Sequence, residues 1–131
     1  MTRRHVRTAA VMAAILIVPA IAGAAMLHLK LLRSEPVANA TLSTSPTQVS
    51  LWFSQKPELS VTSIKVKSGL GTAPVERVLA PISRAAANGA PMVAPLGAPL
   101  GTGHYEIVWR TMARDGHVLS GTIPFDVGAP R

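Results

Sequence analysis

The feature that most constrains the fold is a period-two alternation of apolar and polar residues, which recurs in short runs after residue 27. Alternating runs lie at residues 47–54, 103–110 and 121–127, and a β-branched run lies at 60–67. Because successive side chains of a strand point to opposite faces, each run predicts a half-buried β-strand. Residues 80–102 are rich in Ala, Pro and Gly and predict strand fragments joined by loops.

Nothing after residue 27 has the apolar period of a capped helix. Several short strands in about a hundred residues therefore predict an all-β fold, either an immunoglobulin-like β-sandwich or a Greek-key β-barrel. Pro124 cannot donate a ladder hydrogen bond, so its amide position must face an edge or a bulge. The apolar residues of these runs are Val49, Leu51 and Phe53 on one face, Val61, Ile64 and Val66 in the β-branched run, Tyr105, Ile107 and Trp109 on one face, and Ile123, Phe125 and Val127 facing inward.

The N-terminus has the pattern of a secretory signal peptide. A basic start with three arginines leads into an apolar stretch, and small residues follow Pro19. We predict a helical signal segment at residues 1–25 and one exported domain at 26–131. A retained anchor is the alternative, because residues 9–27 form an uncharged run of 19 residues that could just span a bilayer. Either reading places the domain outside the cytoplasm.

The position of cleavage decides what surrounds His28. A cut after Ala25 makes His28 the third residue, where its imidazole, the free amine and two amide nitrogens can form a square-planar set for copper(II). A cut after Leu27 makes His28 the first residue, although leucine is a poor residue before a cleavage site. Both alternatives stay open at the level of the sequence.

Composition limits the chemistry that the chain can support. It has no cysteine, so a metal site must use His, Met, carboxylate or backbone ligands. The net charge is +7, but outside the first eight residues the basic residues are scattered and form no basic patch with interleaved aromatics. We therefore expect no nucleic-acid partner. With six acidic residues and no catalytic constellation, we also expect no enzyme activity.

Asp115-Gly116-His117 is the motif with the clearest metal-binding chemistry. Residues i and i+2 of an extended chain share a face, so the carboxylate and the imidazole could chelate one ion. Gly116 permits a tight bend if the two side chains must converge further. Such triplets are also common in ordinary turns, and spacing alone favours that simpler interpretation. His104, at the start of a predicted strand, is interpreted as an exposed turn residue.

Five segments together resemble the CopC-type family of periplasmic copper-resistance proteins. The first is His28 to Pro36, in which a histidine heads a strand ending in Ser-x-Pro. Residues 45–54 are similar to the family's Pro-x-x-Val-x-Leu-x-Phe-Ser strand. Residues 103–110, followed by Asp115-Gly116-His117 and Gly121 to Phe125, resemble its Gly-x-Tyr-x-Val-x-Trp-Arg, Asp-Gly-His and Gly-x-x-x-Phe signature. The resemblance spans residues 28–127.

The resemblance implies a periplasmic domain of immunoglobulin-like topology that binds one copper(II) ion. Its ligands would be His28 with its amine, Asp115 and His117, and Trp109 would be a buried neighbour of the site. Partners would be the copper ion and a CopD-type copper transporter of the inner membrane, with membrane contact by the chain itself only if residues 1–25 are retained. Some family members also carry a methionine-rich copper(I) loop. Here that stretch offers only Met92, so no copper(I) site is predicted.

Three functions are compatible with these residues. The leading hypothesis is a copper carrier or buffer in copper homeostasis or resistance, which sequesters the ion or delivers it to a transporter. A small copper oxygenase with a histidine brace is one alternative, although the domain is small for a substrate platform and Asp115 would occupy a position that oxygen needs. The other alternative is a metal-free accessory β-sandwich, in which Asp115 and His117 are turn residues.

Overall fold

The computed structural model describes residues 28–68, 75–83 and 89–128. The predicted signal segment and the alternative membrane anchor lie within residues 1–27, outside this part of the chain. Among the described residues, no helix is long and apolar enough to cross a membrane. Apart from one short 3-10 turn, all the regular structure in these ranges is β-strand.

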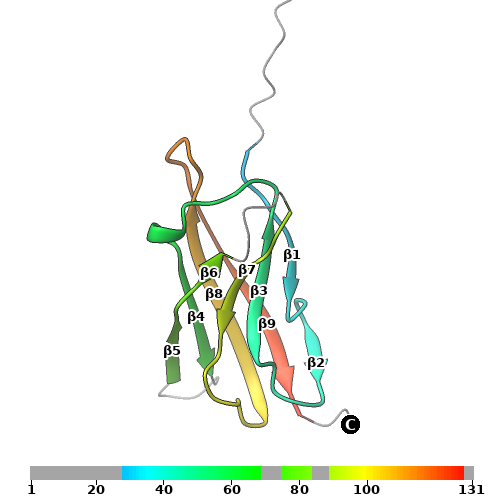
Figure 1. The fold of residues 1–131 in the computed structure, drawn as a ribbon. Helices are drawn as coiled ribbons and strands as arrows, with labels where there is room; N and C mark the ends of the chain where they lie inside the picture. The colour runs from blue at the N-terminus through cyan, green and yellow to red at the C-terminus, as the bar shows by residue number, and fades with distance from the viewer. Residues whose placement is uncertain (1–27, 69–74, 84–88, 129–131) are drawn as a thin grey trace, which may run out of the picture.

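The strands form two sheets that pack face to face (Figure 1). Neighbouring strands are antiparallel, except for β2 and β9, which are parallel. This arrangement confirms the predicted all-β fold and decides for a sandwich rather than a barrel. One sheet has the order β1 (Leu31–Glu35), β3 (Gln48–Phe53), β7 (Met92–Pro95) and β6 (Ile82–Ser83). The other has the order β2 (Ala40–Leu42), β9 (Val118–Val127), β8 (Gly103–Met112), β4 (Ser63–Ser68) and β5 (Val75–Leu79).

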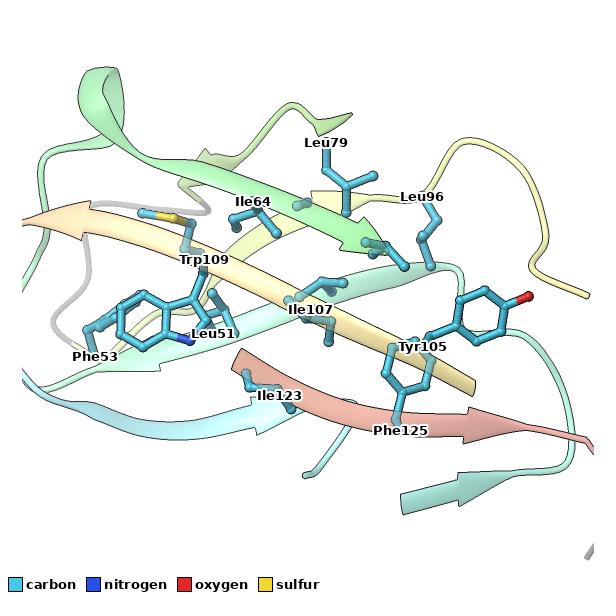
Figure 2. Packing of buried hydrophobic residues seen from close by; sticks show 14 of the residues in the cluster. Leu51, Phe53, Ile64, Leu79, Leu96, Tyr105, Ile107, Trp109, Ile123 and Phe125 are labelled. Carbon is cyan, nitrogen blue, oxygen red and sulfur yellow. The ribbon is translucent and has the colours of Figure 1, made fainter. Parts of the chain in front are cut away.

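The core lies between the sheets and contains nearly all the apolar residues named for the predicted strands. Strands β4 and β8 alternate buried and more exposed residues as the period-two pattern requires. Two aromatic pairs lie at opposite ends of β8 (Figure 2): Phe53 meets Trp109 edge to face, with ring centroids 5.4 Å apart, and Tyr105 stacks on Phe125 at 5.6 Å. Gly121 pairs with Trp109, and a Cβ there would approach the indole to 2.8 Å, so glycine makes room for the ring.

The strand predicted at residues 60–67 begins later than expected. The expected strand at 60–67 is instead a 3-10 turn, η1 (Leu59–Val61), followed by β4, and Val61 is half exposed. Thr62 explains the difference, because its hydroxyl donates to the Glu58 carbonyl at 2.7 Å and contacts the Thr111 hydroxyl at 2.6 Å. These bonds close the turn and delay the strand.

Pro124 lies inside β9, which is not an edge strand. Its carbonyl accepts a hydrogen bond from the Asn39 amide at 2.7 Å, just before the three-residue strand β2 begins at Ala40. Because the nitrogen and carbonyl of one strand residue face the same side, the proline nitrogen also faces this side. The missing donor therefore faces the side of β9 on which β2 has not yet begun. This side is locally an edge of the sheet, which agrees with the prediction that the amide position of Pro124 faces an edge or a bulge.

Candidate functional site

The hairpin that joins β8 to β9 carries two of the predicted metal ligands. Its ends are closed by a hydrogen bond from the Ala113 amide to the His117 carbonyl at 2.8 Å. A second bond, from the Gly116 amide to the Ala113 carbonyl at 2.9 Å, forms the turn. Gly116 has φ of 89°, a conformation that side chains disfavour, so the glycine is required by the backbone here. The turn leaves both Asp115 and His117 exposed to solvent.

Asp115 and His117 are in direct contact. One carboxylate oxygen accepts the His117 backbone amide at 3.0 Å, and the other lies 2.9 Å from Nδ1 of the imidazole. A neutral ring that donates from Nδ1 keeps its lone pair on Nε2, which then faces away from the carboxylate. Asp115 therefore fixes the orientation of His117, in the way that carboxylates orient histidines which bind metals.

These hydrogen bonds lower the pKa of the Asp115 carboxyl. The backbone amide of His117 contributes most and its side chain next, because both stabilise the ionised carboxylate. A group whose pKa is lowered by folding favours the folded turn above the ordinary carboxyl pKa. That contribution is lost as the pH falls through the lowered value.

A carboxyl titration tests this contact. In the metal-free protein, we expect the NMR signal of the Asp115 carboxyl to titrate at a lower pH in wild type than in His117→Ala. The backbone amide remains in the variant, so only the imidazole's share of the pKa shift should disappear. Equal midpoints in the two proteins would contradict the contact.

His28 lies just before β1 and is exposed. The next residue, Leu29, is buried in the core, with 3% of its surface exposed. Figure 1 shows the first described residues and the tip of the β8–β9 hairpin at the same end of the sandwich. The rings of His28 and His117 meet there edge to face, with centroids 6.4 Å apart and planes at 87°. The fold therefore brings together His28, from the start of the described sequence, and His117, from near its end.

The spacing of these rings can be compared with that of two imidazoles on one ion. A metal–nitrogen bond of about 2 Å, with about 1.15 Å from the nitrogen to the ring centre, places two ligand rings at most roughly 6.3 Å apart, when they lie on opposite sides of the ion. The observed separation is close to this limit. In the described part of the chain, no three His, Cys, Asp or Glu side chains are already grouped to hold a metal. Binding of one ion by His28, Asp115 and His117 therefore requires small rotations, which their exposure permits.

His104 was wrongly interpreted as an exposed turn residue. It belongs to β8 and is half-buried, with Nδ1 2.8 Å from an oxygen of Asp126. The two residues are directly opposite in the β8–β9 ladder, a pairing that a register prediction could have found. At about 3.4 Å per residue, His104 lies roughly 30 Å from the hairpin tip. It therefore belongs to the other end of the molecule and is not a further ligand of the candidate site.

The remaining singled-out residues have packing roles. Met92, which lies in the stretch compared with a copper(I) loop, is a core residue of β7 with 4% of its surface exposed. Trp109 is buried against Phe53, as expected. Phe53 in turn pairs with Leu31, three residues after His28, so the indole supports the core beneath this end of the sandwich.

The fold and the candidate site define an all-β sandwich domain that presents two imidazoles and a carboxylate at one end. The sequence model of the CopC domain matches residues 31–128, which is most of the chain. The chain therefore belongs to the CopC domain family, and a copper-related role in resistance follows from that membership.

Known relatives are similar along most of the chain. Copper resistance protein C of Xanthomonas campestris pv. juglandis is 32% identical over 126 residues, covering 95% of this chain and 96% of the relative. Copper transport protein CutJ of Bacillus subtilis (strain 168) is 31% identical over 101 residues, covering 77% of this chain but 18% of CutJ. The chain thus corresponds to a small part of CutJ.

Solved structures support the same assignment. The crystal structure of CopC from Methylosinus trichosporium OB3b has a TM-score of 0.65 and 26% identity, covering 77% of this chain and 94% of that one. PcoC, described as a methionine-rich copper resistance protein from Escherichia coli, has a TM-score of 0.61 and 26% identity, covering 76% and 98%.

Proposed function

We propose that this protein is an exported copper(II)-binding protein, which holds one ion between His28, Asp115 and His117. The observation that carries the proposal is the meeting of His28 and His117, whose rings lie 6.4 Å apart although β1 to β8 separate them in the chain. Two imidazoles and a carboxylate suit copper(II), which prefers nitrogen and oxygen ligands in a tetragonal arrangement. Asp115 either contributes an oxygen or holds His117 in place.

The physiological role in this proposal is binding rather than catalysis. The domain sequesters copper outside the cytoplasm, in the periplasm, or delivers it to a CopD-type transporter of the inner membrane. The likeness to part of CutJ supports the second route, since a similar domain there forms part of a longer copper transport protein. Residues 1–25 act as the export signal, and residues 26–131 form the copper-binding domain. If the signal is retained, it anchors the domain to the membrane.

Titration of the purified exported protein with copper(II) tests the proposal. We expect saturation at one molar equivalent, with an electron paramagnetic resonance (EPR) spectrum typical of tetragonal copper(II) bound to nitrogen and oxygen. Mass spectrometry of the N-terminus establishes whether a free amine lies beside His28. A protein that binds no copper(II) would instead be a metal-free accessory domain. Oxidation of a polysaccharide in the presence of copper and ascorbate would support the oxygenase alternative.

A further inference from the structure

We infer that Ser54 is the positioning residue for the N-terminal copper ligand, His28. The inference rests on the proposed function and concerns a residue that no metal would touch. Ser54 follows the last residue of β3 and is exposed at the end of the sandwich that carries the candidate site. Its hydroxyl contacts the backbone on both sides of Leu29.

The hydroxyl of Ser54 acts as a donor and an acceptor together. It donates to the His28 carbonyl at 3.2 Å and accepts the Lys30 amide at 2.9 Å. The Ser54 amide also donates to the Lys30 carbonyl at 2.8 Å, which extends the β1–β3 ladder toward the N-terminus. Ser54 thus binds the three-residue stretch that precedes β1 at three points.

The stretch needs such an attachment because His28 itself belongs to no strand and is exposed. Burial of Leu29 anchors that side chain, but by itself it would not hold the peptide group of His28. Fixing the backbone of one residue costs conformational entropy, which binding must otherwise supply. Ser54 fixes it in the protein before any metal binds. The contact uses only the carbonyl of His28, so its imidazole stays available beside His117.

Ser54 affects copper(II) binding through His28 and not through Asp115 and His117. Asp115 and His117 are held by their own hairpin bonds and by each other. Loss of the Ser54 hydroxyl should therefore release one ligand and leave the other two in place. Loss of an outer hydrogen-bond partner of a metal ligand typically weakens affinity by about 10- to 100-fold.

The test is a double-mutant cycle on the purified exported protein. Copper(II) dissociation constants are measured by chelator competition for wild type, Ser54→Ala, His28→Ala and the double variant. We expect Ser54→Ala to weaken binding about 10-fold in wild type and by less than about 2-fold when His28 is already alanine. Ser54→Thr keeps the hydroxyl and should retain wild-type affinity. Ser60→Ala, an exposed serine of η1, is the matched control and should also bind normally.

A metal-free measurement accompanies the cycle. NMR cross-peaks between the imidazole protons of His28 and His117 are expected in wild type and Ser54→Thr, and should be lost in Ser54→Ala. The EPR spectrum of copper-loaded Ser54→Ala should shift toward that of His28→Ala.

Three results would overturn the inference: wild-type affinity in Ser54→Ala, an equal loss of affinity with and without His28, or unchanged cross-peaks. The second would mean that Ser54 acts on general structure. A wild-type protein that binds no copper(II) overturns the proposed function and with it the role of Ser54 in binding. The cross-peaks then still decide whether Ser54 holds His28 against His117.

Discussion

Replacing His117 by alanine is expected to weaken copper(II) binding by at least about 100-fold. The loss of an outer partner of a ligand alone costs about 10- to 100-fold, and a lost ligand should cost no less. The variant removes one of the two imidazoles and also frees Asp115 from its ring contact. Chelator competition measures the change, and EPR should show fewer nitrogen ligands. Because the His117 side chain is 72% exposed, its removal should leave the free energy of unfolding nearly unchanged.

His104→Ala is the matched control. His104 also contacts an aspartate through Nδ1, at 2.8 Å against 2.9 Å for His117, but it lies at the opposite end of β8. We expect this variant to bind copper(II) with wild-type affinity. If instead His104→Ala lost copper while His117→Ala retained it, the site would lie at the other end of the sandwich and the proposed ligand set would be wrong.

The alternation of the longest strands carried most of the information about the fold. In β8 and β9, Tyr105, Ile107 and Phe125 are buried where the period of two places them. Alternation is a property of neighbouring residues, so it could not reveal the 3-10 turn at Val61. That turn is closed by Thr62, whose hydroxyl also contacts Thr111, 49 residues away. The same limit explains His104, whose environment is set by pairing with Asp126 across the ladder.

The candidate site could be anticipated only in part. The spacing of Asp115 and His117 permits chelation, but it does not show whether the two side chains are apart or already in contact. In the structure they are in contact, because both carboxylate oxygens accept from His117. His28 was singled out because of the family resemblance and a free amine. Its meeting with His117 depends on the sheet arrangement, and its attachment to Ser54 depends on backbone atoms, to which sequence patterns are insensitive.

Phe125→Ala should have the opposite effect to His117→Ala: a large loss of stability with an intact copper site. Phe125 is fully buried and stacks on Tyr105 at the end of β8 away from the hairpin (Figure 2). Removing a buried phenylalanine ring typically costs about 3–5 kcal/mol, a large part of the roughly 5–15 kcal/mol that stabilises a domain. Urea unfolding of the metal-free protein measures the loss. Val78→Ala, on the exposed side of β5, is the control and should change stability by less than about 0.5 kcal/mol.

Copper should restore part of the stability that Phe125→Ala loses. An ion that binds only the folded state stabilises it by about 2.7 kcal/mol at 100 times its dissociation constant. The hairpin lies about 27 Å along β9 from Phe125, so the folded variant should keep wild-type affinity and gain this amount. His117→Ala at the same copper concentration should gain almost nothing, because its affinity is lower. Equal gains in the two variants would show that copper stabilises the fold from somewhere other than the hairpin.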